Sequence, residues 1–262
     1  MNPDVHFGKT YKQILKLINQ EKGLLFLVID PQDQSPKESG KLAQVAAESG
    51  VNAVAVGGSL GAQGDLLDNT IIEVKEKSKL PVILFPGNIA TISKYADAIY
   101  FMSMMNSRDP YYLSGAQIAA SYPIMKLGLE AIPTSYIVFE PGRAVGWVGD
   151  AKLIPREIPY LAALTALAGH QMGHHLCILE SGSGAPSPVP PSVISTVRKV
   201  IDTPIIIAGG VRNEKFAYES IKAGADILHV GNAAKVCNGN YASCGKLLSK
   251  ISASIKKAGK EK

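Results

Sequence analysis

The sequence predicts an α/β protein built as a single (βα)8 barrel of the TIM type, with one domain over residues 1–262 and a reduced third helix. Three observations lead to this fold. Eight short apolar segments recur along the chain, segments with helical spacing separate most of them, and one turn-and-strand phrase occurs twice. The chain of 262 residues also has the length that such a barrel typically needs, about 250 residues.

The eight apolar segments are the expected strands. None alternates between apolar and polar residues, as a strand with one face in water would. Continuous apolar segments are typical of parallel strands that are buried on both faces and covered by helices. The expected strands are residues 24–29, 53–56, 82–85, 98–102, 136–139, 176–179, 205–208 and 227–230.

The expected helices lie between these strands and carry apolar residues three or four positions apart. The most clearly delimited is 157–170, because Pro155 precedes it and Gly173 follows it. Between the third and fourth strands there is room only for a short helix near 89–95. The other expected helices are 39–49, 65–77, 192–201, 214–223 and 241–255.

The repeated phrase covers residues 50–58 and 224–232. Each copy runs from a glycine through a small polar turn into an apolar strand that ends on glycine. Alternating strands and helices also fit an open doubly wound sheet, but the count of eight and the repeat favour a closed barrel. No linker or low-complexity segment divides the chain.

Composition and charge exclude several classes of protein. The net charge of +5 owes much to the last seven residues, and basicity with so local a source does not indicate nucleic-acid binding. Three cysteines give no disulfide framework and suit a reducing compartment. The chain shows no signal-peptide pattern after Met1 and no apolar run of about 18 residues. We therefore expect a cytoplasmic protein with at most peripheral membrane contact through the C-terminal segment, which we interpret as an outer helix.

Glycines concentrate where the last three expected strands end. The carboxyl ends of the strands carry the site in a βα barrel, and phosphate sits there on backbone N–H groups. Without a Cβ atom, consecutive N–H groups approach an anion closely. Tight turns alone explain one such cluster but not three adjacent ones. The sequence thus predicts a phosphate site in the segments 180–184, 209–210 and 231–232.

Polar residues at other strand ends predict chemistry beside this site. Asp30 ends the first expected strand and Ser59 follows the second, which suits a Mg²⁺ ion that keeps most of its waters and contacts ligand phosphates. Glu180 stands directly before the glycine loop. A carboxylate is unfavourable beside phosphate unless it binds a hydroxyl of the same ligand and takes its proton. The competing interpretations are a turn-capping Asp30 and a purely structural Glu180.

Other motifs are incomplete. Gly182 and Gly184 lack the third glycine of the dinucleotide fingerprint. His170 and His174 have a spacing that fits zinc, but they precede the sixth strand and fall at the opposite end of a barrel. Cys177 lies inside an apolar strand with no base beside it.

With these residues in place, the chain resembles the geranylgeranylglyceryl phosphate synthases of archaea, which are prenyltransferases on a modified βα barrel. The resemblance covers about residues 20 to 235 and depends on short motifs in family order. They are residues 29–31, 56–59, 85–88, 96–98, 102–108, 146–150, 179–185, 209–212 and 231–232.

The resemblance implies Mg²⁺-dependent transfer of a C20 geranylgeranyl group from geranylgeranyl diphosphate to the 3-hydroxyl of sn-glycerol 1-phosphate. This is the first ether bond of archaeal membrane phospholipids. Asp30 and Ser59 match the magnesium positions, and Glu180 is the expected catalytic base. The expected glycerol-phosphate residues are Ile178, Leu179, Glu180, Ser181, Gly182, Ser183, Gly184, Gly209, Gly210, Gly231 and Asn232. Candidates for an apolar groove that holds the prenyl chain are Phe101, Met102, Met104, Met105 and Phe139.

The chain departs from the family pattern at two places. Ile178 stands where relatives commonly have Tyr, which removes a hydroxyl contact to glycerol. Gln32 and Asp33 follow Asp30-Pro31 where many relatives carry Asp-Lys, so the magnesium ligands differ slightly.

Two other functions remain open at this stage. One is a phosphosugar isomerase barrel, which shares the phosphate site but has no prenyl groove. The other is a non-catalytic barrel that binds flavin or a phosphate ligand, which needs neither Mg²⁺ nor Asp30. Members of the family that the chain resembles are often dimers or larger. We therefore expect a homo-oligomer, with Trp147 as a candidate residue of the contact between subunits.

Overall fold

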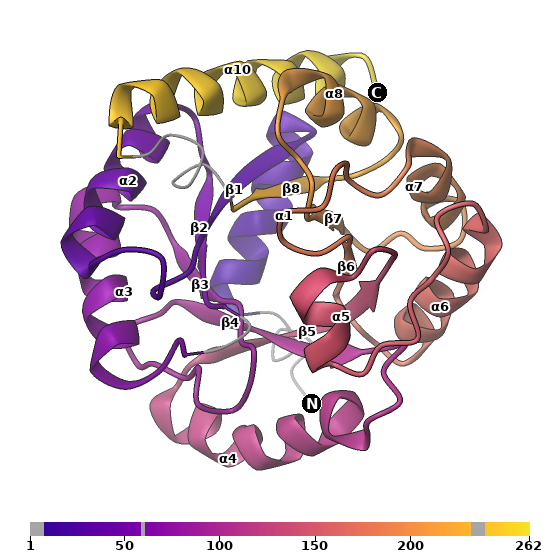
Figure 1. Cartoon of the computed structure of the whole chain (residues 1–262), viewed down its shortest axis with the longest axis horizontal. Helices are drawn as coiled ribbons and strands as arrows, with labels where there is room; N and C mark the ends of the chain where they lie inside the picture. Colours follow the sequence, from indigo (N-terminus) through magenta and orange to yellow (C-terminus); the bar gives the residue numbers. More distant parts are fainter. Residues whose placement is uncertain (1–7, 59–60, 232–238) are drawn as a thin grey trace.

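The computed structural model describes residues 8–58, 61–231 and 239–262. Eight parallel strands form a closed barrel in which each strand pairs with the next and β8 pairs with β1 (Figure 1). The strands are β1 (Leu24–Ile29), β2 (Ala53–Val56), β3 (Val82–Leu84), β4 (Ala98–Met104), β5 (Glu130–Val138), β6 (Leu176–Glu180), β7 (Ile205–Ala208) and β8 (Ile227–Val230). The predicted (βα)8 fold is confirmed.

Helices surround the barrel (Figure 1). They are α1 (Lys9–Glu21), α2 (Pro36–Glu48), α3 (Gly64–Ser78), the π-helix η2 (Tyr111–Gly115), α4 (Ala116–Leu127), α5 (Arg143–Val148), α6 (Pro159–Gln171), α7 (Pro191–Arg198), α8 (Glu214–Lys222) and α10 (Tyr241–Lys260). The two copies of the repeated segment have the same structure at their start. In each copy a glycine with positive φ, Gly50 at 87° or Gly224 at 119°, turns the chain before a strand.

Five elements differ from the expectation. Helices α1, α4 and α5 are additional, and α4 lacks a helical pattern because apolar residues cover it on all sides and Pro123 lies within it. The short helix expected near 89–95 is a turn, in which Asn88 accepts the N–H groups of Ala90 and Thr91. Strand β5 begins at Glu130 rather than at residue 136. Its polar residues interrupt the apolar run but continue the pairing with β4.

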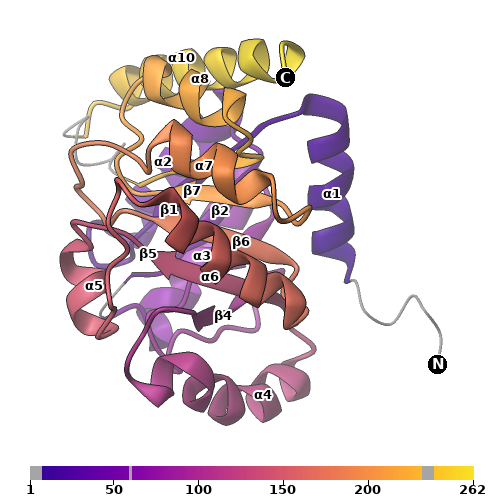
Figure 2. The same ribbon diagram turned by 90° about the vertical axis from the view of Figure 1, so that its right-hand side faces the viewer.

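The barrel is covered by different helices at its two ends. Helix α1 lies at the amino ends of the strands, where the Glu130 carboxylate accepts the N–H groups of Thr10 and Tyr11 at 2.7 and 2.9 Å. Figure 2 shows α1 at one end of the barrel and α5 at the other. The functional site must therefore be sought beside α5, at the carboxyl ends of the strands.

The apolar core has one layer inside the barrel and one between the strands and the helices. Helix α10 belongs to the outer layer, since Leu248, Ile251 and Ile255 are buried and the helix packs on α8 and α2. The interpretation of the C-terminal segment as an outer helix is thereby confirmed. In the described part of the chain, no helix is both long enough and apolar enough to cross a membrane.

Candidate active site

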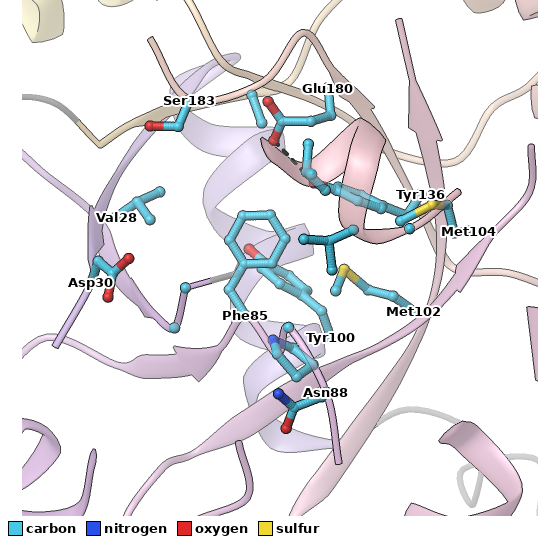
Figure 3. Close-up of a pocket in the computed structure, with 18 of the residues that line it drawn as sticks. Val28, Asp30, Phe85, Asn88, Tyr100, Met102, Met104, Tyr136, Glu180 and Ser183 are labelled. Atoms are coloured by element: carbon cyan, nitrogen blue, oxygen red, sulfur yellow. Dashed lines mark hydrogen bonds between the residues drawn. The ribbon is translucent and has the colours of Figure 1, made fainter. Parts of the chain in front are cut away.

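A cavity of about 250 Å³ opens at the carboxyl ends of the strands. Its wall has three parts: a polar side at β1 and β2, a glycine-rich side at β6 to β8, and an apolar branch that runs under α4 and α5. Figure 3 shows Asp30 on one side of this cavity, Glu180 on another and Phe85 near its centre.

The glycine-rich side is an anion cradle, formed by Ser183, Gly184, Gly209, Gly210 and Gly231. Within the described residues, the backbone N–H groups of Ser183, Gly184 and Gly210 donate to no acceptor. Unpaired N–H groups that face one cavity form a site for a phosphate group. This arrangement fits a phosphate group, and it lies in the glycine-rich segments in which the sequence predicts a phosphate site.

Two glycines of the cradle are required by close packing. Gly209 and Gly210 have φ values of 77° and 79°. A Cβ atom on Gly209 would lie 2.5 Å from Glu180 Oε1, and one on Gly210 would lie 2.3 Å from the carbonyl carbon of Ser187. The loop after β7 therefore fits directly against the loop after β6 only because both residues lack side chains.

The Glu180 carboxyl is the buried acid of the cavity, with 6% of the residue exposed. Its Oε1 accepts the N–H of Gly182 at 2.6 Å, and its Oε2 accepts the hydroxyl of Tyr136 at 3.2 Å. Burial raises the pKa of Glu180 to about 7, and the two hydrogen bonds oppose this rise. A carboxyl with such a pKa can accept a proton near neutral pH.

Tyr136 supplies a hydroxyl that the sequence analysis did not find. It lies on β5 in register with Ile178 of β6, so it stands beside the position at which the resemblance implies a tyrosine. Burial raises the pKa of Tyr136, and the nearby Glu180 adds to the rise. The hydroxyl therefore stays protonated and acts as a donor to Glu180.

Aromatic rings form the floor of the cavity. Phe85 makes edge contacts with Tyr100, Tyr136 and His229, with ring centroids 5.4 to 5.8 Å apart. The Tyr100 hydroxyl pairs with His229 Nε2 at 3.1 Å. Burial lowers the pKa of His229 to about 3, so this ring is neutral.

The polar side of the cavity carries Asp30 and Asp33. Asp30 Oδ1 accepts the N–H of Gln32 at 3.0 Å. Gly58 packs against this carboxylate, since a Cβ atom there would lie 2.4 Å from Asp30 Oδ2. The two carboxylates offer the hard oxygen ligands that Mg²⁺ prefers.

A metal ion on this side of the cavity would have few protein ligands. Among the residues that the structure describes, no three His, Cys, Asp or Glu side chains are grouped as metal ligands. A divalent ion here would take most of its ligands from water and from a bound phosphate group, which fits Mg²⁺.

The apolar branch lies beyond the aromatic floor. Phe101, Met102 and Met104 line it, as expected, and Val145 of α5 and Ile124 of α4 complete its wall. Two other candidates do not line it. Phe139 is fully buried in the outer core and Met105 packs against that core.

The structure brings together most of the predicted site residues. Asp30, Glu180 and the five cradle residues line the cavity. The side chains of Ile178, Leu179 and Ser181 do not, because Ile178 lies deeper in the barrel, Leu179 faces the outer core, and Ser181 accepts a hydrogen bond from Arg156. Gly182 contributes its N–H to Glu180. Ser59 and Asn232 lie outside the described residues.

The residues that sequence reasoning missed share one signal. Tyr100, Tyr136 and His229 each stand two residues from a residue of the same strand that belongs to the inner layer of the core, and these residues are Ala98, Val138 and Ile227. Since alternate residues of a strand share one face, this parity places them in the barrel interior. Arg212 also lines the cavity and donates to the carbonyl oxygens of Gly184 and Ala185.

This geometry defines a phosphate-binding (βα)8 barrel whose cavity extends into an apolar branch. The PcrB family model matches residues 16–242, and the chain belongs to the PcrB family.

Characterised relatives and a solved structure agree with this assignment. The chain is 51% identical over 226 residues to the geranylgeranylglyceryl phosphate synthase of Thermococcus kodakarensis, covering 86% of this chain and 89% of the relative. It is 46% identical to the synthase of Thermococcus gammatolerans, covering 96% and 99%.

The crystal structure of (S)-3-O-geranylgeranylglyceryl phosphate synthase from Thermoplasma acidophilum, in complex with its substrate sn-glycerol-1-phosphate, superposes with a TM-score of 0.87 at 35% identity. The superposition covers 93% of this chain and 98% of that one. The predicted family and the predicted class of enzyme, a prenyltransferase, are confirmed.

Proposed function

We propose that this chain catalyses Mg²⁺-dependent transfer of a geranylgeranyl group from geranylgeranyl diphosphate to the 3-hydroxyl of sn-glycerol 1-phosphate. The observation that carries the proposal is the presence, in one cavity, of an anion cradle, a buried carboxyl and an apolar branch. The relatives named for this product, and the Thermoplasma structure that holds sn-glycerol-1-phosphate, support it.

The glycerol substrate would span the cradle and Glu180. Its phosphate accepts hydrogen bonds from the free N–H groups of Ser183, Gly184 and Gly210. Its 3-hydroxyl then reaches the carboxylate of Glu180. Tyr136 and Gly182 each donate to one oxygen of this carboxylate, so its orientation is set before the substrate arrives.

The reaction breaks the allylic C–O bond of the prenyl diphosphate and forms a C–O ether bond to the glycerol 3-oxygen. The proton of that hydroxyl passes to Glu180, and diphosphate leaves with the electron pair of the broken bond. The aromatic rings of Phe85, Tyr100 and Tyr136 form the floor on which positive charge would develop in the allyl group.

Asp30 and Asp33 would hold Mg²⁺, together with Ser59, which the sequence predicts as a ligand. A Mg²⁺ ion held there would neutralise charge on the diphosphate leaving group. The prenyl chain would then extend from the polar side of the cavity across the aromatic floor into the apolar branch lined by Met102 and Met104.

The test is product formation by the purified protein. Labelled prenyl diphosphates of C15, C20 and C35 are incubated with sn-glycerol 1-phosphate and Mg²⁺, with sn-glycerol 3-phosphate as the control acceptor. We expect an ether-linked product from sn-glycerol 1-phosphate. Absence of ether product from every donor would contradict the proposal. Isomerisation of a phosphosugar, or a flavin that copurifies with the protein, would then favour one of the two other functions.

A further inference from the structure

Arg156 connects three pieces of the chain around the glycerol-phosphate end of the cavity without lining that cavity. It lies between α5 and α6 and is half-buried. Its guanidinium donates to the carbonyl oxygen of Glu140 at 3.1 Å, to Ser181 Oγ at 3.1 Å and to Ser187 Oγ at 2.9 Å. It also donates to the carbonyl oxygen of Pro188.

Three of the four acceptors of Arg156 lie at the two ends of the loop that follows β6. Ser181 is fully buried and directly follows Glu180. Ser187 and Pro188 form the surface against which Gly210 packs, at the distance where no Cβ atom fits. One end of the loop therefore sets the place of the acidic residue, and the other end sets the place of a cradle residue.

The far end of this loop has few other hydrogen bonds. Within the described residues, Arg156 is the sole hydrogen-bond partner of Ser187 and of Pro188. Arg212 holds the middle of the loop, at Gly184 and Ala185, but it lines the cavity and so adjoins the ligand itself. Arg156 is thus the residue outside the cavity on which the spacing of the loop ends depends.

We propose that Arg156 is a positioning residue for sn-glycerol 1-phosphate. It fixes the separation between the Glu180 carboxylate and the N–H of Gly210, so that one ligand can place its hydroxyl on the first and its phosphate on the second. This inference rests on the proposed function. A guanidinium is suited to the task because its planar set of donors serves several acceptors in fixed directions, which an ammonium group cannot do.

The variant Arg156→Lys tests this role, because it keeps the charge and removes the fork of donors. We expect the KM for sn-glycerol 1-phosphate to rise about 10- to 100-fold, the usual effect of losing a residue that orients a site, and kcat to fall as Glu180 is displaced. The KM for the prenyl diphosphate should stay within about twofold, since its expected contacts lie across the cavity.

Arg198→Lys is the matched control. Arg198 is also partly buried and donates to the carbonyl oxygens of Asp202 and Thr203 and to Asp226, but it lies at the amino ends of the strands. We expect it to lower the melting temperature as much as Arg156→Lys does while leaving both KM values unchanged. Similar kinetic changes in the two variants, or equal rises in both KM values for Arg156→Lys, would overturn the proposal.

Two further measurements test the role of Arg156 independently of Arg156→Lys. Ser187→Ala removes one acceptor and leaves Arg156 in place, so it tests the contact even if Arg156→Lys does not fold, and we expect a rise of about threefold to tenfold in the same KM. Calorimetry with sn-glycerol 1-phosphate compares the affinities of the parent and the variants without turnover. A parent that binds this ligand but forms no ether product contradicts the proposed function alone. Unchanged affinity in the Arg156 and Ser187 variants contradicts the role of Arg156.

Discussion

Glu180 is held by a tyrosine on the neighbouring strand and by a backbone N–H of the loop that follows its own strand. Its carboxyl is buried where water cannot solvate the charge, and Tyr136 and Gly182 supply only part of the lost solvation. These opposing effects leave the pKa near neutrality, where a carboxylate is both present and basic enough to accept a proton.

The first prediction concerns this proton acceptor. Glu180→Gln should lower kcat by about 100-fold or more, a typical effect of losing a general base. In the parent, kcat/KM should rise with pH through about 7, because the base works in its deprotonated form. Tyr136→Phe should shift this rise in kcat/KM to higher pH, since the variant lacks a hydrogen bond that lowers the pKa of Glu180. Parental kcat with a raised KM in Glu180→Gln would instead show that Glu180 only positions the glycerol.

The same pKa predicts a stability effect. The folded state holds the Glu180 proton more tightly than the unfolded chain does, so the contribution of Glu180 to stability is full below about pH 4 and is lost as pH rises through about 7. Glu180→Gln cannot ionise. Chemical denaturation at pH 8 should therefore give a larger free energy of unfolding for the variant, by up to about 3 kcal/mol. At pH 4 the two proteins should be equally stable, and a gain of the same size there would contradict the explanation.

Asp30 is predicted to bind the metal that the reaction needs. EDTA should abolish activity, and Mg²⁺ should restore it. Asp30→Asn should reduce activity at saturating Mg²⁺ far more than it changes the melting temperature, because the carboxylate faces the cavity rather than the core. Asp202→Asn, at the opposite end of the barrel, is the control. Equal activity of Asp30→Asn and the parent would contradict this role.

At the scale of elements, the loops after β6 and β7 depend on each other. Gly210 touches the backbone of Ser187, and Gly209 lies against the carboxyl of Glu180. Neither loop can move without moving the other, so the geometry of the cradle depends on the loops after both strands.

Gly210→Ala tests this dependence. The added methyl group must displace the backbone at Ser187, so we expect the affinity for sn-glycerol 1-phosphate to fall at least about tenfold while prenyl diphosphate binding changes little. Gly173→Ala is the matched control, since Gly173 also has positive φ, 88°, but a Cβ atom there meets nothing. Calorimetry measures the affinities of each variant for sn-glycerol 1-phosphate and for prenyl diphosphate. An equal loss of affinity for the two ligands in Gly210→Ala would contradict the existence of separate subsites.

At the scale of the whole molecule, exposed apolar residues gather on helices at the rim of the barrel. Trp147 on α5 is 86% exposed, and Tyr160 and Leu164 on α6 are each 60% exposed. Large aromatic side chains in water are typical of surfaces that meet another protein.

We predict that the protein is a homo-oligomer and that Trp147 contributes to its interface. Light scattering should give a mass that is a multiple of 27.8 kDa, and Trp147→Glu should lower it. Val200→Glu, at a less exposed apolar position, should leave the mass unchanged. A monomeric parent would contradict the prediction.

The sequence by itself determined the barrel, the glycine-rich loops at the strand ends and the position of Glu180. Parallel strands buried on both faces leave continuous apolar runs, and close backbone approach leaves glycines, so both features can be recognised locally. Gly209 and Gly210 illustrate this, because their lack of side chains is required by atoms they touch.

Only the tertiary structure decided which other residues join the site. Tyr136 reaches Glu180 through the register of β5 on β6, and Arg156 reaches Ser181 and Ser187 across more than twenty residues of chain. The apolar branch depends on α4, a helix without a polar face that gives no periodic signal. Such contacts arise when the barrel closes and strand register fixes which side chains meet, and no local pattern in the sequence records that geometry.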